Sequence, residues 1–77
     1  MQNDNQKNLM FNVGDFVKIV DEYCENSNEK ETVFVVTNSN EVTKRCYIRP
    51  INGKLAEMPL VPQELVGWEM IEKIQRN

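Results

Sequence analysis

The stretch Thr32-Val33-Phe34-Val35-Val36-Thr37 decides the fold class of this chain. Each of its six residues is β-branched or aromatic, and such side chains fit the pleated, half-buried surface of a sheet. Polar clusters of turn-forming residues bound the stretch, Asn26-Ser27-Asn28 upstream and Asn38-Ser39-Asn40 downstream. The stretch therefore predicts a β-strand between two polar turns.

The same succession of short apolar stretches and turns extends outward along the chain and predicts four more strands. These strands span residues 16–20, 42–49, 55–61 and 66–74. In the strand at 16–20, the two-residue period places Val17 and Ile19 in the core. In the strand at 42–49, the same period places Cys46 and Ile48 on one face. The pattern is that of an all-β domain.

The link between the strands at 42–49 and 55–61 has the composition of a tight turn. Asn52-Gly53 supplies residues that accept a positive φ, as a two-residue hairpin turn requires. Pro59 lies within the strand at 55–61, and proline in a strand favours an edge position or a bulge. We therefore expect this strand to border an opening in the sheet.

The last part of the chain permits two interpretations. Pro62-Gln63-Glu64-Leu65 predicts one turn of 3-10 helix, started by proline, before a final strand at 66–74. Leu65, Trp68 and Ile71 also fit the spacing of a helix face. If that helix formed, the fold would be a four-stranded sheet with a terminal helix.

Length and charge narrow the class of protein. The 77 residues allow one domain with one modest core. Residues 1–8 are rich in Asn and Gln and predict a flexible leader, which leaves 9–77 as the folded domain. The net charge of −3 disfavours a protein that binds mainly nucleic-acid phosphates. No apolar run approaches the roughly 20 residues of a membrane-spanning helix, so we expect a cytoplasmic protein with no membrane partner.

Two stretches carry a family resemblance. Val13-Gly14-Asp15-Phe16-Val17-Lys18-Ile19 resembles the opening of SH3-like barrels of the KOW type, in which a Gly-Asp turn enters a strand with alternating aliphatic residues. Leu60-Val61-Pro62-Gln63-Glu64-Leu65-Val66 is similar to the end of an SH3 fold, where a strand, a proline-started 3-10 turn and a short final strand follow one another. The resemblance implies a single five-stranded SH3-like barrel of a small bacterial type.

The residue inventory predicts neither catalysis nor a cofactor or metal site. The chain has no histidine, so Cys24 and Cys46 have no imidazole to activate them and cannot complete a four-ligand zinc site. Both thiols are expected to stay reduced in a cytoplasm and to pack as small apolar groups. We therefore predict that the chain is not an enzyme.

Charge is unevenly distributed along the chain. Residues 15–31 hold six acidic and two basic side chains, whereas residues 44–54 hold four basic ones and no acid. One interpretation is that the two segments neutralise each other through cross-strand ion pairs. The other is that the basic segment is a binding patch. The acidic segment could also imitate the charge of a nucleic acid and block a protein that binds one.

Six side chains are the candidate partner-binding residues, namely Lys44, Arg45, Tyr47, Arg49, Tyr23 and Trp68. The middle three project from one face of the strand at 42–49, and interfaces favour arginine and tyrosine. Tyr23 is expected to be exposed on the acidic loop. Trp68 would be a hot-spot residue if exposed, although in so small a domain inward packing is the alternative.

Together these features predict a non-enzymatic binding module of bacterial or phage origin that acts as an adaptor for another protein. The alternatives are a KOW-like nucleic-acid-associated module, in which the basic segment touches phosphates, and an acidic inhibitor of a nucleic-acid-binding protein.

Overall fold

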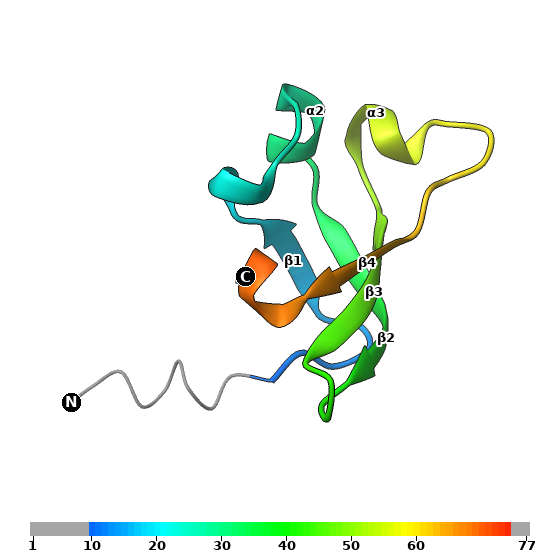
Figure 1. Ribbon diagram of the computed structural model, residues 1–77. Coiled ribbons are helices and arrows are strands. Elements are labelled where there is room, and N and C mark those ends of the chain that lie inside the picture. The colour runs from blue at the N-terminus through cyan, green and yellow to red at the C-terminus, as the bar shows by residue number, and fades with distance from the viewer. Residues whose placement is uncertain (1–9, 75–77) are drawn as a thin grey trace.

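The structure is a computed structural model that describes residues 10–74. The predicted leader at residues 1–8 lies outside the described residues. Within residues 10–74, five strands, two α-helical turns and two 3-10 turns follow one another; Figure 1 shows their arrangement. In chain order they are β1 (Phe16–Ile19), η1 (Asp21–Tyr23), α2 (Ser27–Lys30), β2 (Phe34–Asn40), β3 (Arg45–Pro50), α3 (Gly53–Ala56), β4 (Glu64–Gly67), η2 (Trp68–Met70) and β5 (Ile71–Lys73).

All five strands belong to one antiparallel sheet with the order β4-β3-β2-β1-β5. The predominantly β character and the number of strands agree with the sequence prediction. Within residues 10–74, β4 and β5 are the two edges of the sheet, and no strand pairing joins them to close it. β2, β3 and β4 are antiparallel neighbours in sequence order, joined by a short turn between β2 and β3 and by a longer segment containing α3 between β3 and β4, whereas β5 returns to pair with β1.

The turn before β1 forms as predicted. Gly14 has a φ of 97°, a conformation that glycine adopts without steric cost. The Asp15 carboxylate accepts the backbone N–H of Asn12 at 2.9 Å, and the Asp15 N–H donates to the Asn12 carbonyl at 3.0 Å. The Gly14 N–H then donates to the Val36 carbonyl at 2.9 Å. The turn is thus fastened to β2 before the first strand begins.

The hairpin between β2 and β3 differs from the prediction. Asn38-Ser39-Asn40 was predicted as the turn, but β2 continues through it to Asn40, with an irregularity in register between Val36 and Asn38. The turn occupies 41–44, because the Asn40 side-chain oxygen accepts the N–H groups of Val42 and Thr43 at 2.9 and 3.0 Å. The predicted strand start at Val42 is therefore wrong.

Residues 52–63 contain the largest error of the sequence prediction. Gly53 does take a positive φ of 74°, but it begins α3 instead of a hairpin turn. The reason is a contact between residues distant in the sequence: the Asn52 side chain accepts the Val33 N–H at 2.8 Å, which ties this segment to the start of β2. No strand forms at 55–61, and the segment between α3 and β4 projects away from the sheet, with Leu60 87% exposed (Figure 1).

The C-terminal part also differs from both predicted forms. The 3-10 turn lies at Trp68–Met70, not at 62–65, and Leu65 belongs to β4. The predicted strand at 66–74 is divided between β4, η2 and β5, and no long terminal helix forms. Val66 pairs with Cys46 on β3, whereas Ile71 pairs with Ile19 on β1. Between Val66 and Ile71 the chain therefore passes from the β4 edge of the sheet to the β5 edge, and η2 forms that connection.

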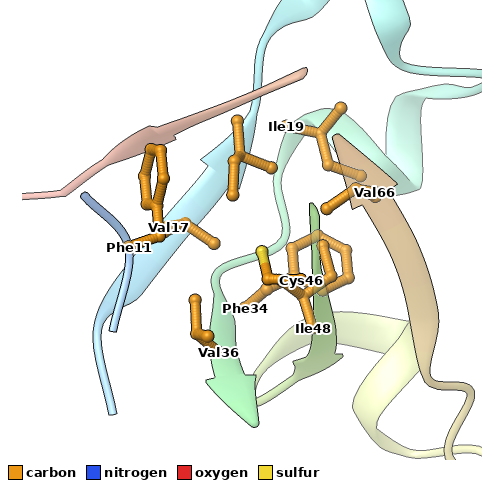
Figure 2. Close-up of a cluster of buried hydrophobic side chains, with 9 residues drawn as sticks. Phe11, Val17, Ile19, Phe34, Val36, Cys46, Ile48 and Val66 are labelled. Carbon is orange, nitrogen blue, oxygen red and sulfur yellow. The ribbon is translucent and has the colours of Figure 1, made fainter. Parts of the chain in front are cut away.

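One hydrophobic core holds the domain together (Figure 2). Val17 and Ile19 of β1 and Cys46 and Ile48 of β3 are buried in it, as the two-residue period predicts. Its other members are Phe11, Phe34, Val36, Val66 and Ile71. Burial of a large apolar side chain stabilises a fold by about 1.5–3 kcal/mol. The opposite face of β3 is consequently turned to solvent.

The acidic segment after β1 is more ordered than the predicted loop. It contains η1 and α2, and Asn26 caps α2 by accepting the Glu29 N–H at 3.0 Å. Glu29 in turn accepts the Glu25 N–H at 2.9 Å and is itself buried. Thr32, also buried, donates its hydroxyl to the Asn28 carbonyl. These local bonds satisfy backbone groups that would be orphaned at the ends of so short a helix.

Candidate functional site

The outer face of β3 displays three of the predicted site residues. Arg45, Tyr47 and Arg49 are exposed and alternate with the buried Cys46 and Ile48. Because alternate side chains of a strand lie on one face, roughly 7 Å apart, the three form a single row. Tyr47 keeps 41% of its surface exposed, which leaves its ring available for contact.

β4 adds a residue to this row that the sequence interpretation missed. Leu65 is the direct partner of Tyr47 in the β3–β4 register and is 51% exposed. Directly opposed residues of an antiparallel pair share a face. Leu65 was missed because it was assigned to a 3-10 turn, and Glu64-Leu65-Val66-Gly67 has no apolar–polar alternation that would indicate a strand. We call Arg45, Tyr47, Arg49 and Leu65 the β3–β4 face.

Two shallow hollows flank this face, and Arg45 and Leu65 line both. The first, of about 250 Å³, lies over the β2–β3 side and is also lined by Asn38 and Tyr47. The second, of about 240 Å³, lies toward η2 and is also lined by Gly67 and by the acidic residue Glu69. An arginine and a leucine between two hollows give an incoming group both an apolar contact and a charged one.

The arginines of this face have no acidic partner within residues 10–74. In that part of the chain the ion pair present joins Lys73 to Asp15, at 3.5 Å. No ion pair joins the basic segment at 44–54 to the acidic segment at 15–31. The interpretation that the two segments neutralise each other through cross-strand ion pairs is therefore wrong. The guanidinium groups of Arg45 and Arg49 stay available to a carboxylate or a phosphate.

Lys44 and Trp68 contact each other and do not join the row on the outer face of β3. Lys44 ends the β2–β3 turn with a φ of 59°. Its carbonyl accepts the backbone N–H of Trp68 at 2.9 Å. Its ammonium nitrogen lies 4.9 Å from the centroid of the Trp68 ring, a cation–π arrangement. Phe11 meets the same indole edge to face, with centroids 5.6 Å apart. Trp68 is thus partly buried and packs against the core.

Tyr23 lies apart from the β3–β4 face. It ends η1, directly after β1, and is 39% exposed. Tyr23 follows β1 and Tyr47 lies on β3, and β2 separates these two strands in the sheet. Tyr23 is exposed, as expected. A single compact interface on the β3–β4 face would, however, include Tyr47 without Tyr23.

The two thiols are in surroundings that favour the neutral form. Burial raises the pKa of Cys46. Burial also raises the pKa of Cys24, and the carboxylates of Glu29 and Asp21 raise it further. The Cys24 thiol donates to the Ile19 carbonyl at 3.5 Å. A neutral thiol is a poor nucleophile and a poor metal ligand, and among residues 10–74 no cluster of Cys, Asp and Glu side chains is arranged to hold a metal ion.

Acidic side chains gather where β4 begins. Glu64 is half-buried there, and its pKa is raised by burial first and then by the nearby charges of Glu29 and Glu25. Part of the charge of the acidic segment, that of Glu29, is therefore buried and lies near the carboxyl group of Glu64. It presents less charge to solvent than its composition suggests.

Comparisons with protein-family models, with curated proteins and with solved structures find no match for this chain. Of the helices in residues 10–74, none has the length and apolar character needed to cross a membrane.

Proposed function

We propose that this chain is a binding module that captures an acidic surface of another protein through the β3–β4 face, and that its sheet is an SH3-like barrel. The observation that carries the functional proposal is the pair of arginines, Arg45 and Arg49, exposed and without an acidic partner, on either side of Tyr47. Arginine and tyrosine are the side chains that carry binding energy in protein interfaces. A partner carboxylate would supply the missing charge.

The barrel proposal is supported by the strand order. β2, β3 and β4 follow one another in the sheet, β5 pairs with β1, and η2 precedes β5. The resemblance to SH3-like barrels implies a Gly-Asp turn before the first strand and a 3-10 turn before the last one, and both are present. The resemblance at Leu60–Val66 gives less support, because the 3-10 turn follows that stretch at Trp68–Met70.

The test compares partner capture by the purified chain, by the double variant Arg45→Ala/Arg49→Ala, and by the matched control Lys30→Ala/Lys54→Ala. Both variants remove two exposed positive charges, so a general effect of net charge would act equally on them. We expect proteins retained from a lysate of the native host by the chain and the control to be lost from the arginine variant. Equal retention by all three would refute the proposal.

A nucleic-acid partner is the second candidate, because the same unpaired arginines would also suit phosphates. A single-stranded DNA oligonucleotide and a duplex titrated at two salt concentrations distinguish the candidates. Binding to phosphates weakens steeply with added salt. Tight, steeply salt-dependent oligonucleotide binding that Arg45→Ala/Arg49→Ala abolishes would favour the nucleic acid over the protein.

A further inference from the structure

We infer that the hollow of about 240 Å³ beside β4 binds a free α-amino acid with an apolar side chain, with its carboxylate at Arg45 and its ammonium group at Glu69. The inference goes beyond the proposed function, because this ligand is a small molecule and not a protein, although Arg45 belongs to both sites. Pockets for drug-sized ligands measure about 300–1,000 Å³. A hollow of this size therefore suits a smaller molecule.

The Glu69 carboxylate lies at this hollow because residue 67 is a glycine. A Cβ atom on Gly67 would lie 2.5 and 2.7 Å from the two carboxylate oxygens of Glu69, closer than such atoms approach each other. The carboxylate thus occupies the space that a side chain at residue 67 would fill. Gly67 has a φ of −79°, which residues with a side chain also adopt. The absence of a side chain, and not the backbone conformation, is therefore what admits Glu69.

Arg45 lies directly across the strand pair from this carboxylate. Arg45 and Gly67 are partners in the β3–β4 register, and opposed residues of an antiparallel pair share a face, with Cβ atoms about 4.5–5.5 Å apart. The two charged groups nevertheless form no ion pair with each other, since within residues 10–74 the ion pair present joins Lys73 to Asp15. A guanidinium group and a carboxylate thus line one hollow, and each is available to a further ion.

Apolar residues form the rest of the hollow. Leu65 and Val66 line it from β4, and Met70 lines it from η2. A 3-10 helix has three residues per turn, so Met70 returns to the start of η2, where its sulfur accepts the Gly67 N–H at 3.4 Å. Leu65 is 51% exposed. The apolar side chain of a ligand could therefore contact Leu65 and Met70 while its charged groups meet the two ions.

Opposite charges at one hollow select a ligand that carries both charges. An anion at Arg45 would also meet the negative charge of Glu69, and a cation at Glu69 would meet the positive charge of Arg45. A neutral ligand would displace water from both ions without replacing its hydrogen bonds. A free α-amino acid carries an ammonium group and a carboxylate on one carbon atom, whereas a residue inside a protein chain has both groups in peptide bonds. The charges therefore favour the free amino acid over an acidic or a basic protein segment.

The test titrates L-leucine into the ¹⁵N-labelled full chain and follows the amide signals by NMR. We expect the largest shifts at Leu65, Gly67 and Glu69. Two matched analogues each lack one charge: 3-methylbutylamine lacks the carboxylate, and 4-methylpentanoate lacks the ammonium group. We expect each analogue to bind at least tenfold more weakly than leucine. The absence of shifts with leucine at millimolar concentration, or equal binding of either analogue, would overturn the inference.

Protein variants assign each charge of the ligand to a residue. Glu69→Gln should weaken leucine binding at least tenfold without weakening 4-methylpentanoate, so that the two ligands bind alike. Arg45→Gln should likewise make leucine and 3-methylbutylamine bind alike. Lys54→Gln and Glu72→Gln remove exposed charges outside the hollow and should leave the affinity for leucine within twofold. If Glu69→Gln keeps the preference for leucine over 4-methylpentanoate, the inference is wrong.

Gly67→Ala tests the position of the carboxylate without removing a charge. The new Cβ atom would displace the Glu69 carboxylate from its place, so leucine binding should weaken at least tenfold. Unchanged amide signals in β1 and β2 would show that the variant is folded. A folded Gly67→Ala variant that binds leucine like the parent chain would contradict the inference. The comparison of leucine with 4-methylpentanoate in Glu69→Gln decides the matter if Gly67→Ala unfolds.

The outcomes separate this inference from the proposed function. If the parent chain captures a protein that Arg45→Ala/Arg49→Ala loses, but leucine causes no shifts, the proposed function is supported and the amino-acid site is refuted. If leucine binds with the expected dependence on Glu69 while the parent chain, the arginine variant and the lysine control retain the same proteins, the amino-acid site is supported and the proposed function is refuted.

Discussion

The acidic segment at 21–31 and the basic segment at 44–54, which contains β3, carry formal charges of equal size and opposite sign, but the fold uses them differently. In the acidic segment, Glu29 is buried and accepts a backbone N–H, and Asn26 caps the helical turn beside it. On β3, Arg45 and Arg49 extend into solvent without an acidic partner in the described part of the chain. Opposite charges in a sequence therefore do not imply mutual pairing.

The difference shows that a hydrogen bond to the backbone, as well as attraction to another charge, can determine where a charged side chain lies. Glu29 serves a neighbouring N–H, because a buried donor without an acceptor costs about 1–3 kcal/mol. The arginines serve no group of their own sheet within residues 10–74. Substitutions in the two regions should accordingly affect different properties, stability in the acidic segment and partner binding on β3.

The largest loss of stability is expected for Glu29→Ala. Its removal leaves the Glu25 N–H without its acceptor and opens a buried position, so the free energy of unfolding should fall by about 1–3 kcal/mol. Urea unfolding followed by circular dichroism measures it. Glu31→Ala, at an exposed position close by, is the control and should change the free energy by less than about 0.5 kcal/mol. Equal effects of the two would remove the distinction between buried and solvated acids.

A smaller loss is expected for Asn26→Ala. The side chain accepts the Glu29 N–H at 3.0 Å as the N-cap of α2, and loss of such a cap costs about 1 kcal/mol. Asn28→Ala keeps the carbonyl that accepts the Thr32 hydroxyl and should be nearly neutral. Thermal unfolding of the two variants side by side tests this, and an Asn28→Ala variant that is the less stable one would contradict it.

The pH dependence of stability should identify Glu64. Its pKa is raised from the ordinary value of 4.5, chiefly by burial, so the folded state binds a proton more tightly than the unfolded state. Its contribution is therefore full below the unfolded pKa and is lost as the pH rises through the folded pKa. Glu64→Gln should remove this part of the pH dependence in urea unfolding from pH 4 to 7. The exposed Glu41→Gln should leave the curve of the parent chain unchanged.

The smallest effect on stability is expected for Arg45→Ala and Arg49→Ala. Neither side chain has an ion pair within residues 10–74, so each substitution should change the free energy of unfolding by less than about 0.5 kcal/mol. Calorimetry of both single variants measures this. A loss of several kcal/mol would assign the arginines a structural role and weaken the contrast with Glu29.

The strands that the sequence predicts well are those in which buried and exposed residues alternate. Val17 and Ile19 were predicted to face inward, and Cys46 and Ile48 to share one face, because the two-residue period depends only on local geometry. The same period predicted that Arg45, Tyr47 and Arg49 share the other face of β3. Sequence alone therefore locates the row of Arg45, Tyr47 and Arg49 correctly as a surface.

The parts that the sequence does not predict depend on distant contacts. The Asn52 side chain turns the chain into α3 because it reaches the Val33 N–H, a partner 19 residues away. Leu65 joins the candidate face because β4 pairs with β3, and no local pattern shows which strand it will meet. Whether oppositely charged segments form ion pairs likewise depends on their positions in the sheet.

The contacts of Trp68 have a practical consequence. It is the chain's single tryptophan, and it lies where three segments far apart in the sequence meet: Phe11 before β1, Lys44 in the β2–β3 turn, and η2 itself. An indole held between a ring and an ammonium group differs optically from one in water. The domain thus contains a built-in fluorescent reporter, whose emission during refolding follows the arrival of the hairpin and of the N-terminal segment without any added label.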